Sequence, residues 1–374
     1  MLEPVTLDIR MMNHSGIGSY LRGLLEGMAL VADAPSFLFY GPPRFRAMIP
    51  ERLCELYVLR DYPVYTLTEQ LRFPESLRFQ SLFHAPHYNI PLRFRGRLIV
   101  TIHDLNHLVF EDSLPTFLHR QYARFMHREV AARASHIITV SEKTRKEVLD
   151  ILEVSPERVT TILPGIGRDF GPCEDAGAVR AFQEKRGLPG SYLLCVGIHK
   201  PHKNYPFLIQ SLAALWKGKK LDLPLVIAGP EGKRREDLER IGVEAKTGDH
   251  VFFPGRISRE EMPLVYAGAA LLVFPSLYEG FGLPPLEAMK CGIPVLSSNR
   301  DPMPEVIGDA GVFFDPLSMG DFQENLLQIL SDLELQKDLV EKGRQRAERF
   351  DWVDTARETI RIYRQVLGDG DNQE

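Results

Sequence analysis

The chain is poor in cysteine and has no excess of positive charge. Its 374 residues include four cysteines, Cys54, Cys173, Cys195 and Cys291, which lie far apart and form no CxxC pair. This spacing argues against a disulfide framework and against a zinc site built on paired cysteines. The formal net charge is −5, whereas proteins that bind nucleic acid in general are basic. We therefore expect neither disulfides, nor a metal site, nor a nucleic-acid partner.

Long apolar runs are also missing. No stretch of about 18 apolar residues occurs, so no membrane span is expected. The segment Met1-Leu2-Glu3-Pro4-Val5 lacks the basic stretch and the following apolar stretch of a secretory signal, so none is expected. The natural interpretation is a cytoplasmic protein.

Short apolar runs instead alternate with amphipathic stretches along the whole chain. The expected strands cover residues 5–9, 36–40, 81–84, 97–102, 136–140, 159–163, 192–196, 223–228, 250–253, 270–274 and 294–297. The expected helices cover residues 18–31, 115–133, 142–152, 205–216, 259–267, 283–290 and 321–331. Strands that alternate with helices predict an α/β protein with parallel sheets covered on both faces.

The alternation breaks over residues 164–190, which contain three prolines and six glycines. A chain of this length exceeds one ordinary core, so two domains are expected. We place the first Rossmann-like domain at 1–170 and the second at 171–350, followed by a terminal helix and tail at 351–374. In doubly wound sheets the ligand crevice lies outside the carboxyl ends of the strands. Two such domains facing across a cleft are therefore predicted.

The strongest candidate for a site covers residues 276–288. Gly280 and Gly282 flank Phe281 after an apolar strand, which permits a tight turn and close approach of a ligand. Two prolines then open a helix, whose N-terminal N–H groups suit a phosphate. Glu279 and Glu287 offer carboxylates that accept strong hydrogen bonds from sugar hydroxyls. The competing interpretation is a plain strand–turn–helix unit with two solvated glutamates.

Three weaker candidates follow other strands. Lys200 and Lys203 lie in a basic loop after the strand 192–196 and can each offer a charge to a diphosphate, or simply be solvated. His103 ends the strand 97–102 and can act as a hydrogen-bonding or acid–base group, although a structural role is the commoner one. Gly16 and Gly18 form half of a dinucleotide fingerprint, with Leu21 in place of the third glycine.

Two charged segments of the chain have no function assigned from the motifs above. Arginines are frequent in the first domain, at Arg72, Arg78, Arg93, Arg95, Arg97, Arg120, Arg124, Arg128 and Arg133. They form either an ordinary solvated face or a surface for anionic lipid or a lipid-diphosphate acceptor. The triplet Asp369-Gly370-Asp371 looks like an acidic metal pair but lies in the polar tail, so we give it no weight.

In this order, these elements resemble the retaining GT-B glycosyltransferases of family 4. The resemblance covers nearly the whole chain and rests on residues 16–20, 103–104, 135–141, 163–165, 197–204, 253–255, the Glu279-x7-Glu287 segment and the terminal helix after Phe350-Asp351-Trp352. It implies that residues 1–170 bind the acceptor, that residues 171–350 bind the nucleotide-sugar donor, and that the terminal helix crosses back to pack on the first domain.

The same resemblance implies a role for each site residue. Glu279 would hold hydroxyls of the donor sugar, Glu287 the ribose hydroxyls, and Lys203 the diphosphate. Amides around Phe281, Gly282 and Leu283 would face sugar and diphosphate. His103 would contact the sugar near the reacting centre, and Gly16 and Gly18 would let the first domain close over the phosphates.

One position departs from the family pattern. Many members carry an arginine after the glycine that corresponds to Gly197, where this chain has Ile198. The diphosphate charge would then rest on Lys203 together with a substitute, for which Lys200 and Arg256 are the candidates.

The resemblance implies transfer of a hexose from a nucleoside diphosphate sugar to an acceptor hydroxyl, with retention and without metal or cofactor. The tracts 68–74 and 201–204 resemble a mannosyltransferase subgroup, which favours GDP-mannose over UDP-glucose. The acceptor would be a carbohydrate or lipid-linked, in polysaccharide, lipopolysaccharide or glycolipid synthesis, and peripheral contact with the inner face of the membrane stays open. The alternatives are a sugar-nucleotide epimerase, a phosphorylase, or a non-catalytic nucleotide-sugar-binding protein; the missing third glycine disfavours a dehydrogenase.

Overall fold

The computed structural model describes residues 4–53, 56–59, 64–110, 116–229 and 231–368. Cys54, the predicted helix start at Pro115 and the triplet Asp369-Gly370-Asp371 lie outside the described residues. The chain divides into two compact units, called unit 1 (Met1–Gly165 with Phe350–Glu374) and unit 2 (Ile166–Arg349). The sequence placed the first boundary at residue 170, and the structure places it between Gly165 and Ile166.

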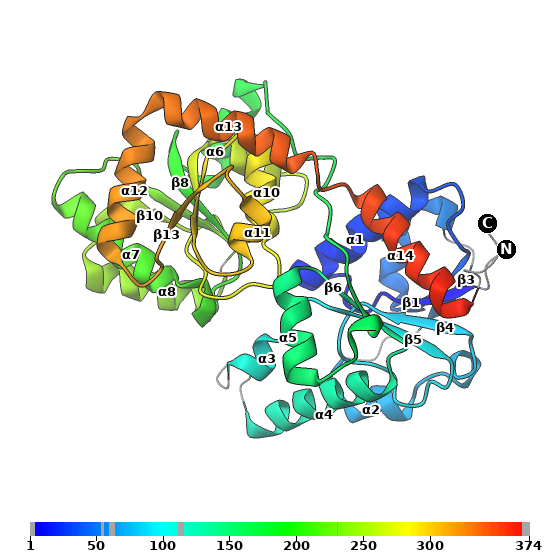
Figure 1. Cartoon of the computed structure of the whole chain (residues 1–374). Coiled ribbons are helices and arrows are strands. Elements are labelled where there is room, and N and C mark those ends of the chain that lie inside the picture. Colours follow the sequence, from blue (N-terminus) through cyan, green and yellow to red (C-terminus); the bar gives the residue numbers. More distant parts are fainter. Residues whose placement is uncertain (1–3, 54–55, 60–63, 111–115, 230, 369–374) are drawn as a thin grey trace. The chain divides into compact units, whose positions relative to one another are not determined.

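Unit 1 contains a seven-stranded parallel sheet in the order β3-β2-β1-β4-β5-β6-β7 (Figure 1). The strands are β1 (Val5–Asp8), β2 (Phe37–Gly41), β3 (Leu56–Leu59), β4 (Leu82–Ala85), β5 (Arg97–Ile102), β6 (His136–Thr139) and β7 (Val159–Thr161). Chain order reverses between the neighbours β1 and β4, since β2 and β3 lie to one side and β5 to β7 to the other. The point between them is the topological switch point of this sheet.

The helices of unit 1 cover its sheet. They are α1 (Ser15–Leu30), α2 (Leu67–Leu71), α3 (Asn106–Val109), α4 (Phe117–Arg133), α5 (Glu142–Leu152) and α14 (Trp352–Leu367). The last of these confirms that the terminal helix packs on the first domain. Glycines allow its close approach to α1: a Cβ on Gly23 would lie 1.9 Å from Trp352 Cε2, and one on Gly27 2.1 Å from the Trp352 carbonyl oxygen.

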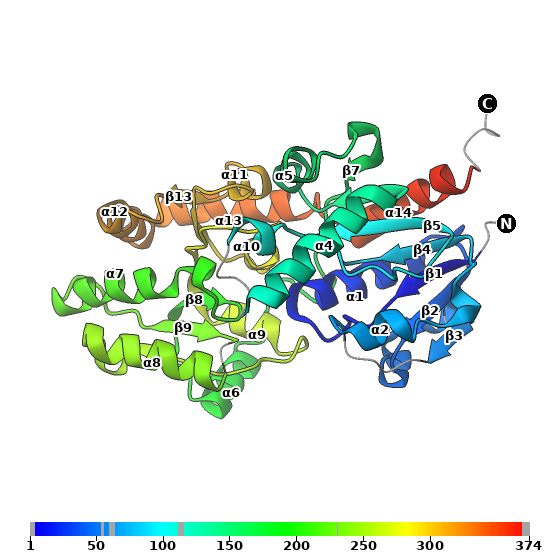
Figure 2. The same cartoon turned by 90° about the horizontal axis from the view of Figure 1, so that it is seen from below.

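Unit 2 contains a six-stranded parallel sheet in the order β10-β9-β8-β11-β12-β13. The strands are β8 (Tyr192–Val196), β9 (Leu225–Ala228), β10 (Val251–Phe252), β11 (Ala269–Phe274), β12 (Val295–Ser298) and β13 (Val312–Phe314). The helices are α6 (Ala176–Arg186), α7 (Tyr205–Lys217), α8 (Lys233–Ala245), α9 (Met262–Ala267), α10 (Leu283–Lys290), α11 (Met303–Ile307), α12 (Met319–Ser331) and α13 (Leu333–Ala347). Figure 2 shows α7 and α8 side by side against this sheet.

Helix α6 corrects the expectation that residues 164–190 are a break in the alternation. The Asp175 side chain accepts a hydrogen bond from Ala178 N at 3.0 Å and so caps the start of the helix. Gly187, at φ +62°, ends it in the left-handed conformation that glycine adopts without strain. Phe182 is buried, which anchors the helix although the segment is rich in glycine and proline. Among the described helices none is long and apolar enough to cross a membrane.

Candidate active site

Three glycines bring together the carboxyl ends of β8, β9 and β10. Gly197, Gly229 and Gly255 follow these strands at φ of +135°, +122° and +75°. A Cβ on Gly229 would lie 2.9 Å from the Gly197 carbonyl oxygen, and the Gly229 N–H donates to the Gly255 carbonyl oxygen at 3.0 Å. Because these positions carry no side chains, the end of the sheet is rimmed by backbone that a ligand can approach closely.

Lys203 and Glu279 meet at this end of the unit 2 sheet. Lys203 Nζ donates to Glu279 Oε1 at 2.5 Å and lies 5.2 Å from the centre of the Phe274 ring. The Leu277 N–H donates to the His202 carbonyl oxygen at 2.7 Å, which ties the lysine loop to the glutamate segment. The two side chains keep exposed fractions of 16% and 15%, so a ligand can still reach both.

Glu287 lies on α10 with an unexpected partner. The Tyr266 hydroxyl, which is fully buried on α9, donates to Glu287 Oε2 at 2.6 Å. Desolvation raises the pKa of Glu287 to about 7, although the Tyr266 hydrogen bond lowers it. The nearby Asp169 raises the pKa of Glu287 further and Arg259 lowers it, and these two form a bidentate pair at 3.0 and 3.2 Å. Glu287 is therefore a carboxylate close to its ionisation point at neutral pH.

The turn before α10 has the glycine that the sequence indicated. Gly282 lies at φ +100°, and a Cβ there would approach Met303 Cε to 2.5 Å, so glycine is required twice over. Phe281 is buried and anchors the turn. Two prolines occupy the second and third positions of α10, and proline has no N–H. The amides left without an intrahelical partner at this end are therefore those of Gly282 and Leu283, half the number that an ordinary helix start offers.

The two candidate substitutes for the missing arginine lie in loops of unit 2. Lys200 and Arg256 are exposed and form no ion pair with any described residue. The backbone N–H of Arg256 donates to Glu231 Oε1 at 3.0 Å, which holds the loop after Gly255. Ile198 is half-buried. Which of the two cations faces a diphosphate stays a prediction.

In unit 1, His103 follows β5 as expected. Its Nε2 lies 3.0 Å from the Pro86 carbonyl oxygen, and its ring meets that of Tyr20 edge-on at 4.8 Å. A carbonyl can only accept, so Nε2 carries the proton and Nδ1 is an acceptor in the neutral ring. Burial lowers the pKa of His103, which keeps the ring neutral at pH 7. Asp104 Oδ1 accepts from the Asn106 N–H at 2.9 Å and acts as a turn residue.

Gly16 and Gly18 lie in the first turn of α1, which begins at Ser15, three residues before the helix start that the sequence predicted. A Cβ on Gly18 would lie 2.3 Å from the Met12 carbonyl oxygen, so this glycine is required by packing. No atom lies within 4 Å of the corresponding position on Gly16, which leaves its face open. Gly18 thus has a structural reason to be glycine, and Gly16 is the one available to a ligand.

The structure places the predicted residues in two groups. Unit 2 brings Lys203 and Glu279 into contact and pairs Glu287 with Tyr266, while His103 and the two N-terminal glycines belong to unit 1. The sequence missed Tyr266, because it precedes β11 and shares no motif with Glu287. Among the described residues no group of three or more histidine, cysteine or acidic side chains is arranged to hold a metal ion.

Comparison with known families agrees with this architecture. The family model "Glycosyl transferases group 1" matches residues 180–346, and "Glycosyltransferase Family 4" matches residues 37–170. The chain therefore belongs to the family 4 glycosyltransferases and has their GT-B fold, with two Rossmann-like parallel-sheet units.

Among the relatives of this chain are mannosyltransferases. O-antigen chain mannosyltransferase B of Escherichia coli is 29% identical, over 94% of this chain and 96% of its own length. O-antigen chain mannosyltransferase RfbU of Salmonella typhimurium is 27% identical, over 77% of this chain and 75% of its own. The solved structure of Anabaena HepE in complex with UDP-glucose matches the fold with a TM-score of 0.77 at 15% identity, over 97% of this chain and all (100%) of that one.

Proposed function

We propose that this glycosyltransferase moves a hexose from a nucleoside diphosphate sugar to an acceptor hydroxyl, with retention of anomeric configuration and without a metal ion. The observation that carries the proposal is the pairing of Lys203 with Glu279 at the carboxyl end of the unit 2 sheet. This pair puts a cation and a hydroxyl acceptor within one hydrogen bond of each other, as a sugar joined to a diphosphate requires.

Lys203 supplies charge to the leaving group. An ammonium has three N–H donors and Glu279 takes one of them, so two remain for phosphate oxygens. The amides of Gly282 and Leu283 add donors that need no reorientation as charge develops on the diphosphate. Lys203 and these amides stabilise the negative charge that develops on the diphosphate. We therefore propose that the reaction needs no metal ion.

The two carboxylates divide the donor between them. Glu279, oriented by Lys203, accepts from hydroxyls of the sugar, and Glu287, oriented by Tyr266, accepts from hydroxyls of the ribose. In unit 1, Nδ1 of neutral His103 is the acceptor for another sugar hydroxyl. The donor is GDP-mannose in preference to UDP-glucose, supported by the relatives named as O-antigen chain mannosyltransferases.

We propose that retention proceeds without a covalent glycosyl–enzyme intermediate, with Glu279 as a binding group. A carboxylate held by an ammonium and by sugar hydroxyls is a poor nucleophile. The diphosphate departs and the acceptor hydroxyl attacks the same face of the sugar. The leaving phosphate oxygen then takes the acceptor's proton.

A donor panel tests the proposal. Thermal shifts are measured with GDP-mannose, UDP-glucose and their free diphosphates, since a ligand at a hundred times its Kd adds about 2.7 kcal/mol. We expect GDP-mannose to give the largest shift and to be hydrolysed slowly without acceptor, in EDTA as in buffer. NMR of the early product should show the α anomer that the α-linked donor carries. An inverted product, or activity abolished by EDTA, contradicts the retaining or the metal-independent part.

The same panel separates the alternatives. An epimerase would convert the free sugar nucleotide into its epimer, and a non-catalytic binder would show a thermal shift without hydrolysis. A phosphorylase would need pyridoxal phosphate on a lysine, which an absorption scan detects. None of these outcomes is expected if Lys203 and Glu279 act as proposed.

We also propose that helix α4 contacts a membrane surface, where a lipid-linked acceptor would lie. Phe117, Leu118 and Phe125 are 63%, 77% and 46% exposed, and the 100° spacing of a helix puts them on the same side as the exposed Arg124 and Arg128. Exposed apolar side chains can enter the interface of a bilayer, and arginines beside them can meet anionic head groups. Two further arginines of this unit, Arg78 and Arg93, form surface ion pairs with Glu75 at 2.9 and 3.4 Å.

Vesicle flotation tests this contact. The protein should float with vesicles that contain phosphatidylglycerol and not with pure phosphatidylcholine, and R124E/R128E should reduce the bound fraction several-fold. The control K337E/K342E reverses two exposed lysines on α13 of unit 2. Equal loss in both variants would show a response to net charge alone and would contradict a site on α4.

A further inference from the structure

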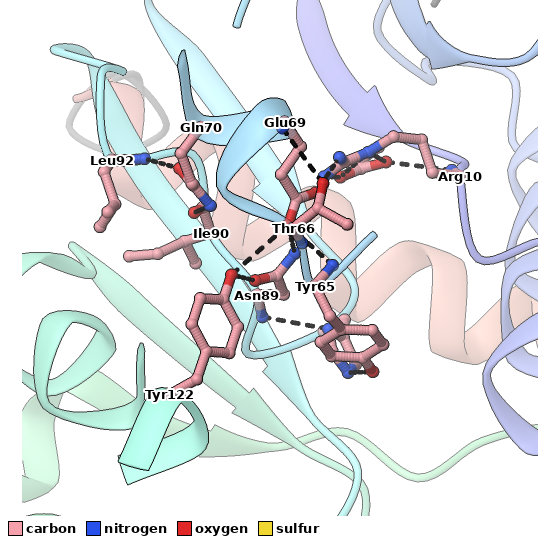
Figure 3. Close-up of polar contacts among 11 residues, drawn as sticks. Arg10, Tyr65, Thr66, Glu69, Gln70, Asn89, Ile90, Leu92 and Tyr122 are labelled. Atoms are coloured by element: carbon pink, nitrogen blue, oxygen red, sulfur yellow. Dashed lines mark hydrogen bonds and ion pairs between the residues drawn. The ribbon is translucent and has the colours of Figure 1, made fainter. Parts of the chain in front are cut away.

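A buried polar network lies at the switch point of the unit 1 sheet, outside the residues that the family pattern singles out. We call it the Glu69 network: Arg10, Tyr65, Glu69, Asn89 and Tyr122 (Figure 3). Glu69 is 3% exposed on the short helix α2. A buried carboxylate costs free energy unless its oxygens are fully hydrogen-bonded, so its partners identify what it organises.

Glu69 joins four segments that are distant in sequence. Its Oε1 accepts from the Tyr65 backbone N–H at 2.8 Å and from Asn89 Nδ2 at 2.6 Å, and it lies 3.4 Å from the Tyr122 hydroxyl oxygen. Its Oε2 accepts from Arg10 Nη1. These neighbours come from the loop after β1, the start of α2, the loop after β4, and α4. One carboxylate therefore sets the relative positions of four pieces of the carboxyl edge of the sheet.

The network has no positive charge to spare. Arg10 is bound by Asp8 at 3.0 and 2.6 Å as well as by Glu69, so one guanidinium faces two carboxylates. His87, the neighbour of Asn89, has its pKa lowered well below the usual value by burial and is neutral. A phosphate would therefore meet no uncompensated cation in this network. A neutral ligand rich in hydroxyls fits the charge balance.

Two tyrosines give the network a partly exposed side. Tyr65 and Tyr122 are half-buried, whereas Glu69, Asn89 and Arg10 beneath them are buried. The Tyr122 hydroxyl donates to Asn89 Oδ1 at 2.5 Å, and the Tyr65 hydroxyl shares a hydrogen bond of 2.7 Å with His87 Nε2. A ring face beside a fixed hydroxyl combines an apolar surface with a hydrogen-bonding tip. The two faces of a pyranose, with their C–H groups and hydroxyls, need that combination.

The position in the fold favours a ligand too. Arg10 follows β1 and Asn89 follows β4, the two adjacent strands between which the strand order reverses. In doubly wound sheets this point, outside the carboxyl ends, is where ligands bind. The corresponding edge of unit 2 holds the proposed donor site, which leaves the edge in unit 1 for the second substrate.

We propose that the side of unit 1 formed by Tyr65 and Tyr122 is a subsite for a neutral hexose of the acceptor, and that Glu69 is the positioning residue that holds it in shape. This inference rests on the proposed glycosyl transfer and assigns one of its two substrates to named residues. Glu69 acts through its partners, so its loss should weaken acceptor binding and leave donor chemistry intact.

The test compares E69Q and Y122F with wild type, using mannotriose as the acceptor probe. The Kd of mannotriose is measured by calorimetry. Its KM and the kcat are measured for transfer from GDP-mannose, and the rate of GDP-mannose hydrolysis is measured without acceptor. In E69Q an amide N–H2 faces Arg10, so the acceptor KM should rise about tenfold or more, in proportion to a lost charge-assisted bond. Y122F keeps the ring and should raise KM about fivefold, the effect of one hydrogen bond. Donor hydrolysis should stay within twofold in both.

The control is E75Q, which removes an exposed carboxylate a few residues away that pairs with Arg78 and Arg93. It should leave the acceptor KM unchanged. If E69Q fails to fold, Y122F alone decides, since it removes one partly exposed hydroxyl. A fall of kcat with unchanged KM, or equal losses of transfer and donor hydrolysis, would overturn the positioning role.

Two further outcomes separate this inference from the proposed function. If wild type hydrolyses GDP-mannose and mannotriose neither binds nor accepts mannose, the hexose subsite is wrong while the donor assignment stands. If mannotriose binds through Tyr122 and no nucleotide sugar is bound or hydrolysed, the subsite stands and the proposed transfer is wrong.

Discussion

Glu287, a carboxylate of the proposed donor site, allows the free-energy cost of burying a charge there to be measured as a change in the stability of the folded protein. Desolvation raises its pKa from 4.5 to about 7. At about 1.4 kcal/mol per unit, that shift corresponds to an upper limit of about 3 kcal/mol for holding the charged form. The side chain is partly exposed, so solvent screening lowers the expected figure to about 2 kcal/mol.

The sign follows from proton binding. Between pH 4.5 and 7 the folded protein keeps a proton on Glu287 that the unfolded chain has lost, so stability falls as the pH rises through this window. Glutamine carries no charge and still accepts from the Tyr266 hydroxyl. E287Q should therefore equal wild type near pH 4.5 and exceed its free energy of unfolding by about 2 kcal/mol at pH 8.

Urea unfolding of wild type and E287Q from pH 4.5 to 8.5 measures this difference in the free energy of unfolding. If the two units unfold separately, the value is taken from the transition of unit 2. E236Q removes an exposed carboxylate on α8 and controls for the change in net charge. The same E287Q should bind donor more weakly, because it loses the ionised acceptor for the ribose. A variant no more stable than wild type at pH 8 would refute the desolvation argument.

Three further predictions concern the same groups. K203A should lower the transfer rate at least about a hundredfold, because it removes a charge that stabilises the transition state. K200A should lower the rate much less. Equal steady-state rates in the two variants would contradict the Lys203 assignment. The affinity for GDP-mannose, measured by calorimetry, should rise as the pH passes through 7 and Glu287 ionises, and a flat profile would argue against its role. G18A should lower the free energy of unfolding by about 1–3 kcal/mol through overpacking against Met12, and so lower Tm. G16A should be neutral or stabilising by up to about 1 kcal/mol. Equal thermal melts of the two variants would disprove the packing difference.

Elements with strong local signals were predictable from sequence. The bounds of β5, β8, α5 and α10 agree residue for residue with the expected ranges, because apolar runs or capping residues define both ends. Strands β3 and β13, which lie at the edges of their sheets, were missed. Helix α6 was missed because glycines and prolines around it obscured a cap that becomes visible only through the Asp175 hydrogen bond.

The site was predictable where it follows a motif and hidden where it depends on long-range pairing. The proximity of Lys203 to Glu279 could be anticipated, because both follow neighbouring strands β8 and β11. The partner of Glu287 could not, since Tyr266 lies on the preceding helix with no periodic relation to it. Glu69 was visible only as part of a tract that resembles a subgroup; its partners come from three other segments of the sheet edge.

The return of α14 to α1 has a consequence for how the two units can be separated. Unit 2 is a single uninterrupted segment, whereas unit 1 is made of two. A Cβ on Gly165, where the chain leaves unit 1, would lie 2.2 Å from Trp352 N, where it has just come back. Unit 2 is thus an insertion into one place in unit 1. A fragment cut at Gly165 would leave the glycine-lined face of α1 uncovered, while a chain that joins Gly165 directly to Phe350 would retain both halves of that helix pair.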